Sequence, residues 1–127
     1  MPMDIIILGS SDKPIYQQLF DQISAQIIKG QLKEGHCLPP IRTVARELQI
    51  SVITVKKAWE ELERAGFIVT MLGKGCFVAH LTAEGRSDKR TGLALDKLKK
   101  DIEYYKSLEL TMEELIELIR LYYDEQP

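Results

Sequence analysis

Residues 41–78 read IRTVARELQISVITVKKAWEELERAGFIVTMLGKGCFV, and the pattern of this segment is the strongest indication of the fold. Its apolar side chains recur every three or four residues in two short runs, the spacing of a buried helix face. The first run is Ile41, Val44, Ala45 and Leu48, and the second is Val55, Ala58, Trp59 and Leu62. Gln49 and Ile50 make a tight turn between them, and Ser51 is a good N-cap. The pattern therefore predicts two helices joined by a tight turn.

The period changes after Gly66. Residues 67–71 and 76–80 are short runs of residues that favour strands, and a glycine-containing turn at 72–75 separates them. This arrangement predicts a β-hairpin. Two short helices, a tight turn and a hairpin together make a winged helix-turn-helix.

The preceding segment predicts one more helix and a terminal arm. Pro14 suits a first helical position, and Gly30 suits a helix stop. Between them, Ile15, Leu19, Ile23 and Ile27 repeat every four residues. This helix should lie under the helix-turn-helix and complete its core. Residues 4–8, DIIIL, predict either a short strand or an apolar arm.

The segment after the hairpin divides into a linker and a tail. Residues 81–92 are polar, contain two glycines and have no apolar period, so they predict a linker. Residues 93–127 predict two amphipathic helices, the second opened by a capping box at Thr111–Glu114. We therefore expect an α+β, mainly helical chain with a winged helix-turn-helix domain at 10–80, a linker at 81–92 and a helical tail at 93–127.

The composition indicates a soluble, globular protein. Of the 127 residues, 45% are hydrophobic and 28% charged, which excludes a disordered chain. The longest apolar run, residues 5–8, is far too short to span a membrane. Residues 1–4 lack a basic region and predict no secretory signal, and two cysteines are too few for a disulfide framework. These features together predict a cytoplasmic protein that does not bind membranes.

Charge is distributed unevenly along the chain, although its formal total is only -2. Residues 29–80 carry eight basic and five acidic side chains, a net of +3, and residues 93–127 carry five basic and nine acidic ones, a net of -4. A basic middle and an acidic tail are typical of proteins that bind a polyanion through one part. Counts alone are equally consistent with ordinary surface charge.

The amino end of the helix after Ser51 is the candidate functional site. A recognition helix enters the DNA major groove with its N-terminal residues toward the bases, and its dipole favours phosphate there. Lys56 and Lys57 would contact a guanine edge or a phosphate, and the Ser51 and Thr54 hydroxyls would contact phosphate. Val52 and Ile53 would be either partly buried or in contact with thymine methyl groups. The full set of candidate DNA-binding residues is Arg42, Thr43, Ser51, Val52, Ile53, Thr54, Lys56, Lys57, Gly73 and Lys74.

These residues carry a family resemblance that runs from about Pro14 to Val78. The ordered set is Gly35, Leu38, Pro39, Pro40, Arg42, Ala45, Leu48, Ile50, Ser51, Thr54, Val55, Ala58, Leu62, Gly66, Phe67 and Ile68. It resembles the DNA-binding domain of GntR-family bacterial transcription regulators, and residues 73–78, GKGCFV, resemble the family's wing. The short tail resembles the YtrA-like branch. The resemblance implies a transcriptional repressor, often of its own operon or of neighbouring transporter genes.

The resemblance also implies roles for particular residues. Arg42 matches an arginine that contacts DNA, Thr54 and Lys56 match recognition-helix positions, and Gly73 matches a wing glycine near the minor groove. Several residues depart from the family pattern. Val52 and Lys56 stand where many members have arginine, which removes the planar group that reads guanine bidentately. Cys76 replaces a threonine and Pro40 a serine, so the operator sequence cannot be transferred from other members.

The tail is the candidate dimerisation element. Its apolar residues exceed what two helices can hide from each other, which leaves the winged domain or a second copy as the covering surface. The resemblance to the YtrA-like branch favours a homodimer, which would bind an inverted-repeat operator. The residues expected in that interface are Leu95, Leu98, Ile102, Tyr105, Leu115, Ile119, Tyr122 and Tyr123.

Other chemistry fits the sequence less well. His36, Cys37, Cys76 and His80 have poor zinc spacing, so we expect no metal and no cofactor. Cys76 and His80 lack a third catalytic partner, and residues 73–75 are too short for a phosphate-binding loop, so no enzyme is expected. No segment predicts an effector domain. The alternative function is a winged-helix protein–protein interaction module without DNA binding.

Overall fold

The computed structural model describes residues 4–125. Residues 1–3, part of the segment that predicted no secretory signal, and residues 126–127 of the expected tail lie outside the described part. The elements in chain order are α1 (Ile15–Ile28), α2 (Ile41–Leu48), α3 (Val52–Arg64), β1 (Ile68–Met71), β2 (Gly75–Val78), α4 (Ala83–Ser107), α5 (Met112–Tyr122) and a 3-10 turn, η1 (Tyr123–Glu125). They form two compact units, Met1–Ser87 and Asp88–Pro127. The chain is mainly helical with one small sheet, as predicted.

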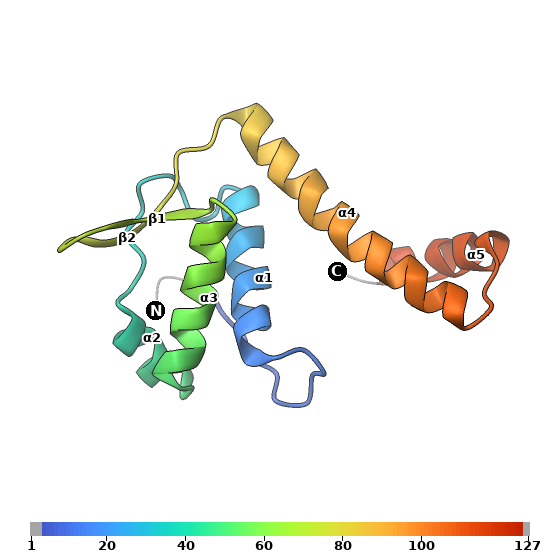
Figure 1. Cartoon of the computed structure of the whole chain (residues 1–127), viewed down its shortest axis with the longest axis horizontal. Helices are drawn as coiled ribbons and strands as arrows, with labels where there is room; N and C mark the ends of the chain where they lie inside the picture. Colours follow the sequence, from blue (N-terminus) through green and yellow to red (C-terminus); the bar gives the residue numbers. More distant parts are fainter. Residues whose placement is uncertain (1–3, 126–127) are drawn as a thin grey trace. The chain divides into compact units, whose positions relative to one another are not determined.

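The first unit is a winged helix-turn-helix. In it α3 packs against both α1 and α2 and is followed directly by the β1–β2 hairpin (Figure 1). Pro14 precedes α1, and Gly30 follows it with a φ of 79°, so both predicted ends of this helix are confirmed within a residue. The predicted tight turn is also present, because Gln49 adopts the left-handed conformation with a φ of 56°.

The core of this unit comes mainly from the predicted helix faces and strands, and the loop between α1 and α2 adds Leu32 and Leu38. The buried apolar residues are Leu19, Ile23, Ile27, Leu32, Leu38, Val44, Ala45, Val55, Ala58, Trp59, Leu62, Phe67, Ile68 and Val78. Phe20 of α1 meets Phe67 edge to face, with 6.0 Å between the ring centroids. Helix α1 thus lies under α3 and joins the hairpin to the helical core.

The hairpin is antiparallel, with Ile68 opposite Val78 and Met71 opposite Gly75. The loop before α2 adds a third segment, because Cys37 forms an isolated bridge with Phe77. Ile68 and Val78, at the base of the hairpin, are buried, whereas the strands lose burial toward the tip. The hairpin is therefore fixed at its base and projects its tip outward.

Residues 4–8 form an arm and not a strand. Three glutamines of α1, spaced four residues apart, hold its backbone with their side-chain amides. Gln22 bonds both the N–H and the carbonyl of Ile6, at 2.9 and 2.6 Å, and Gln18 does the same for Leu8 at 2.8 and 3.0 Å. Gln26 donates to the carbonyl of Asp4 at 2.8 Å. The side-chain amides thus take the place that a neighbouring strand would have.

The predicted irregular linker at 81–92 is wrong from residue 83 onward. Helix α4 begins at Ala83 and continues for 25 residues, through Gly85 and Gly92. Thr82 Oγ1 accepts a hydrogen bond from the Gly85 N–H at 2.9 Å, which caps the first turn. The other residues of this segment are mostly tolerated in helices, so the two glycines, at about 1 kcal/mol each, do not break the helix.

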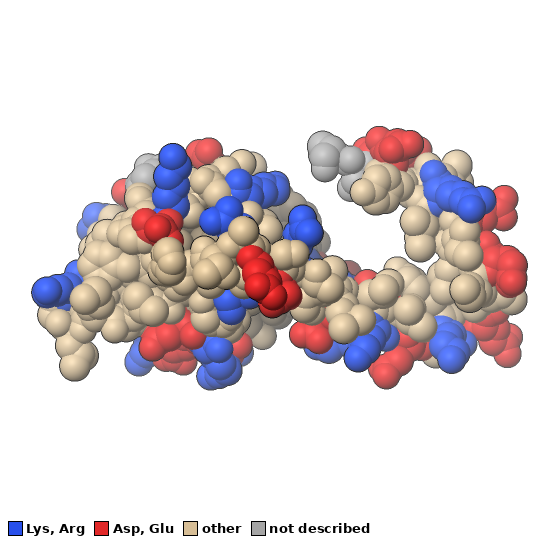
Figure 2. Space-filling model, turned by 90° about the horizontal axis from the view of Figure 1, so that it is seen from above, with Lys and Arg blue, Asp and Glu red and all other residues tan. Residues whose placement is uncertain are grey.

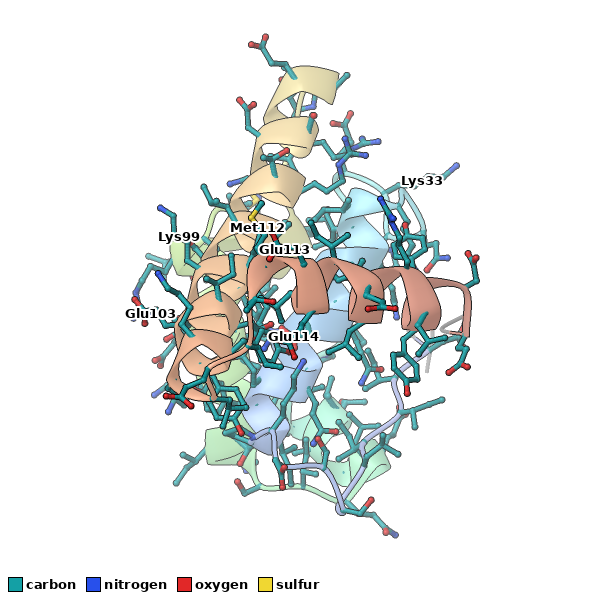
Figure 3. The ribbon with its side chains drawn as sticks, turned by 90° about the vertical axis from the view of Figure 1, so that its right-hand side faces the viewer. Lys33, Lys99, Glu103, Met112, Glu113 and Glu114 are labelled. Carbon is teal, nitrogen blue, oxygen red and sulfur yellow. The ribbon has the colours of Figure 1, made fainter. Side chains whose placement is uncertain are left out.

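The second unit contains the rest of α4 and all of α5. The predicted capping box is confirmed, because Thr111 Oγ1 accepts from the Glu114 N–H and Glu114 Oε1 accepts from the Thr111 N–H. Figure 3 shows Glu113 and Glu114 at the start of α5, and Lys99 and Glu103 on α4. Neither α4 nor α5 has a buried residue. Among the described residues, no helix is long and apolar enough to cross a membrane.

Candidate nucleic-acid interface

The candidate interface is built on the first turn of α3. Ser51 caps this helix, since its Oγ accepts from the Thr54 N–H at 3.1 Å and lies 2.7 Å from Thr54 Oγ1. The first turns of α2 and α3 contain no acidic residue. The positive end of the α3 dipole is therefore not neutralised by a carboxylate within the turn, which suits contact with phosphate.

Lys56 and Lys57 are both exposed, but their surroundings differ. The Nζ of Lys57 lies 4.0 Å from the centroid of the Tyr16 ring, a cation–π contact with α1. Among the residues that the structure describes, Lys56 has no ion-pair partner. Lys56 is thus available to a base or phosphate, whereas Lys57 is held beside α1. Tyr16 is a residue that the sequence reasoning missed, since only the tertiary packing brings it to α3.

Val52 and Ile53 are not core residues. The side chain of Ile53 is 79% exposed and that of Val52 is 38% exposed. The core positions of α3 are instead Val55, Ala58, Trp59 and Leu62, as predicted. Of the two interpretations of this pair, partial burial is therefore excluded for Ile53.

Arg42 and Thr43 lie in the first turn of α2. Arg42 is exposed and Thr43 is half-buried. Within the described part of the chain, Arg42 has no ion-pair partner either. The predicted residues of α2 and α3 thus lie on consecutive helices joined by a three-residue connection, Gln49 to Ser51.

The wing presents its own residues at the hairpin tip. Gly73 and Gly75 have φ angles of 76° and 114°, a region that other residues rarely adopt, and they flank the exposed Lys74. Leu72, which the sequence reasoning did not single out, is 96% exposed beside them. Because Leu72 lies in the predicted turn at 72–75, its exposure could have been expected from the sequence. The tip therefore offers one cation, two glycines and one apolar side chain.

Charge on the surface is mixed. On the face seen in Figure 2, Lys and Arg side chains are interspersed with Asp and Glu. The basic middle of the sequence is partly neutralised in the structure. Arg64 Nη1 donates to Glu61 Oε1 at 2.5 Å, and this carboxylate raises the pKa of the Arg64 guanidinium. The C-terminal end of α3 is thus paired, and the unpaired cations lie toward its amino end.

The histidines and cysteines do not form a metal site within residues 4–125, where no group of three or more suitable ligands comes together. The loop before α2 does pair with β2, as the bridge between Cys37 and Phe77 shows. That bridge places Cys37 beside β2, the strand that contains Cys76. His80, however, pairs with Glu34.

The predicted dimerisation residues are largely exposed within a single chain. Exposed fractions are 44% for Leu95, 52% for Leu98, 58% for Ile119 and 75% for Tyr123. Ile102 and Tyr122 are also exposed, and Tyr105 and Leu115 are half-buried. The described part of the second unit thus leaves its apolar side chains without a core of their own.

The sequence comparisons agree with this geometry. The pattern described as "Bacterial regulatory proteins, gntR family" matches residues 15–78, the part of the chain that holds α1, α2, α3 and the hairpin. The chain belongs to the GntR family. It is 33% identical over 112 residues to the uncharacterised HTH-type transcriptional regulator YhcF of Bacillus subtilis, covering 88% of this chain and 92% of that protein. It is also 33% identical to the HTH-type transcriptional repressor YtrA of Bacillus subtilis, covering 79% and 78%.

Solved structures resemble this GntR-family regulator over different lengths. A transcriptional antiterminator from Listeria monocytogenes matches 97% of this chain and 92% of its own, with 35% identity and a TM-score of 0.74. YtrA from Sulfolobus acidocaldarius, a GntR-family transcription factor, matches 96% and 98%, with 31% identity and a TM-score of 0.57. The DNA-binding domain of AraR, solved in complex with operator ORR3, matches 61% and 94%, with 28% identity and a TM-score of 0.50.

The regulator is therefore a DNA-binding transcription regulator of the YtrA branch and not an enzyme. Its matched region contains every candidate DNA-binding residue, from Arg42 to Lys74. The prediction of fold class and family from the sequence is confirmed. The individual DNA contacts stay predictions. The exposure and partners of the side chains on α3 and the wing indicate which residues to test first.

Proposed function

We propose that this chain is a homodimeric repressor that binds an inverted-repeat operator, acts in the cytoplasm and controls its own operon or a neighbouring transporter operon. The observation that carries the proposal is the first turn of α3, which exposes Val52 and Ile53, contains no acidic residue and is followed by the exposed Lys56. Lys56, like Arg42 in the first turn of α2, has no ion-pair partner among residues 4–125. A turn of this kind fits the major groove, where a recognition helix places its N-terminal residues.

The tail supports the dimer. Both of its helices lack buried residues, yet α5 carries an apolar face with Leu115, Ile116 and Ile119. Two such tails that cover each other would remove this surface from water, which is the main driving force of association. A twofold axis through the tails would give two recognition helices and therefore an inverted repeat with half-sites about one helical turn apart.

The names of relatives support repression as the mode of regulation. YtrA of Bacillus subtilis is a transcriptional repressor, and the AraR domain was solved on operator DNA. A repressor of this type blocks a promoter by occupying it. The DNA bound by our regulator is therefore expected in its own upstream region.

The test is a mobility-shift assay of the full chain on the upstream region of its own gene, with an excess of unrelated duplex as competitor. The proposal expects a shifted band that survives the competitor, and footprinting expects protection of two symmetric half-sites. Binding that the competitor abolishes contradicts sequence-specific recognition. The alternative, a protein-interaction module, predicts no shift at moderate salt.

A further inference from the structure

The first turn of α3 exposes two apolar side chains, Val52 and Ile53, and neither belongs to the buried core of the described chain. Ile53 is 79% exposed, and Val52 is 38% exposed on the same turn. Isoleucine and valine are weaker helix formers than alanine, so their presence does not favour the turn itself. Burial does not explain Ile53, and helix propensity explains neither side chain.

The polar groups near this pair are already engaged. The Ser51 and Thr54 hydroxyls contact each other at 2.7 Å, and the Ser51 hydroxyl also accepts from the Thr54 N–H. The Lys57 ammonium lies over Tyr16. Lys56 is the remaining exposed polar side chain of the first two turns of α3. The surface at the tip of α3 is therefore largely apolar, with one flexible cation beside it.

A base pair offers only one apolar group to a helix in the major groove, the C5-methyl group of thymine. Lys56 follows the pair on α3, and Arg42 lies in the first turn of the preceding helix; both are exposed and have no ion-pair partner among residues 4–125. These cations suit a polyanion as the occupant of this surface and not an apolar protein groove. We propose that Val52 and Ile53 read thymine methyl groups, so that each operator half-site places thymine against the tip of α3. This inference rests on the proposed function, because it requires α3 to lie in the major groove.

The inference assigns a physical basis to the specificity. A lysine places a point charge and cannot fix a guanine bidentately as arginine does, so it discriminates bases less sharply. Methyl contacts discriminate by burial, since replacing thymine with cytosine removes the methyl group and presents an amino donor to an apolar surface. The expected preference of the half-site is therefore for A·T pairs with a defined strand orientation.

The experiment removes only the methyl groups from DNA. The full chain first selects duplexes from a pool with a randomised core long enough for two half-sites. Each conserved thymine of the selected site is then replaced by deoxyuridine, which pairs identically but lacks the C5-methyl group. Affinity for these duplexes is measured by fluorescence anisotropy with wild type, Val52→Ala and Ile53→Ala.

The expected result is a loss of about fourfold in wild-type affinity for each methyl group that contacts the tip of α3. Ile53→Ala or Val52→Ala should weaken binding to the thymine site and lose most of the sensitivity to deoxyuridine. The matched control is Ile6→Ala, the same change at another isoleucine, 70% exposed, on the arm. Its deoxyuridine penalty should equal that of wild type. Because Ile53 is exposed, its variant should unfold at the wild-type temperature.

Three possible results distinguish failure of the methyl readout from failure of the proposed function. Specific binding with no deoxyuridine penalty at any thymine overturns the methyl readout and leaves the proposed function intact. A penalty that persists in both Val52→Ala and Ile53→Ala also overturns the readout, because another group must then contact the methyl. Failure to select any sequence contradicts the proposed function itself.

Discussion

Lys56 and Lys57 are adjacent in sequence but stand in different environments. The Tyr16 ring lies 4.0 Å from Lys57 Nζ, and such a contact stabilises the cation in that position. Lys56 has no corresponding partner within residues 4–125. Since both residues lie one turn from the amino end of α3, the difference between them comes from α1 and not from their own helix. DNA binding is therefore expected to depend more on Lys56.

The substitution Lys56→Ala should weaken operator binding by about 1–3 kcal/mol and relax the base preference at one position, provided that its ammonium contacts a base. If the ammonium contacts only phosphate, binding should weaken on all sequences and the salt slope should shrink by about one. Anisotropy titrations at several salt concentrations measure both. Lys100→Ala, at an exposed lysine of α4, is the control for the loss of one charge. Equal binding by Lys56→Ala and wild type at every salt concentration excludes both roles.

Ser51 holds the first turn of α3 in place. Its Oγ satisfies the Thr54 N–H, one of the amides that no helical carbonyl reaches. The substitution Ser51→Ala should lower the free energy of unfolding by about 1 kcal/mol. Urea unfolding followed through the fluorescence of Trp59, the single and buried tryptophan, measures this change. Ser51→Asp keeps an acceptor at the cap and should retain most of the stability. A Ser51→Ala variant as stable as wild type would show that the cap is dispensable.

These residues show how far sequence reasoning reaches at this scale. The capping roles of Ser51 and Thr111 follow from local spacing, because their partners are three residues away. The contact between Tyr16 and Lys57 joins residues from different helices, and no local pattern encodes it. Similarly, the sequence left Ile53 open between partial burial and exposure, since the orientation of the first turn depends on how α3 packs on α1.

Among the secondary-structure elements, the arm and α4 differ from their local sequence patterns in opposite ways: one is less regular than its pattern allows, and the other is more regular. The four apolar residues 5–8 fit either a strand or an arm. In the structure their neighbour is the helix α1, which offers no strand edge for backbone pairing. The glutamines at 18, 22 and 26 supply amide groups at helical spacing instead. In α4, glycines and a polar composition suggested a linker, yet a threonine cap and continuous helical hydrogen bonding outweigh them. Short-range sequence signals, such as glycines or a run of apolar residues, therefore favour one type of secondary structure but do not determine it.

The bonds between the α1 glutamines and the arm can be tested one glutamine at a time. The substitution Gln22→Ala removes both bonds to Ile6 and should speed amide hydrogen exchange at Ile6 strongly, while Leu8 stays protected by Gln18. Hydrogen exchange followed by NMR measures this, because exchange reports local opening. The matched control is Gln17→Ala, since the Gln17 amide bonds Asp21 and not the arm. Unchanged exchange at Ile6 in the Gln22→Ala variant would mean that the two Gln22 bonds are not what protects the Ile6 amide.

At the scale of the whole molecule, the two units have different sources of stability. In the described part of the first unit, fourteen buried apolar residues form a core drawn from three helices, the hairpin segment and the loop between α1 and α2. Most of these residues belong to apolar patterns that can be recognised in the sequence. The second unit buries none of its described residues. Its helices were predicted because amphipathic periodicity is local, but the surface that covers them is not local. A single sequence leaves that surface open between the winged unit and a second copy.

The proposed dimer can be tested in this second unit. The substitution Leu98→Glu places a carboxylate on the apolar face of α4, where covering by a second tail would require desolvating the charge. The dimer dissociation constant should therefore rise at least tenfold, about 1.4 kcal/mol, by sedimentation equilibrium. The first unit should remain folded, because Leu98 is 52% exposed and belongs to no core. Leu72→Glu, at the 96% exposed wing leucine, is the matched control and should leave the dimer unchanged. Loss of the dimer should also reduce binding at a two-half-site operator to that of one half-site, since each monomer then binds without its partner's contribution. A Leu98→Glu variant that dimerises as tightly as wild type would place the interface elsewhere on the chain.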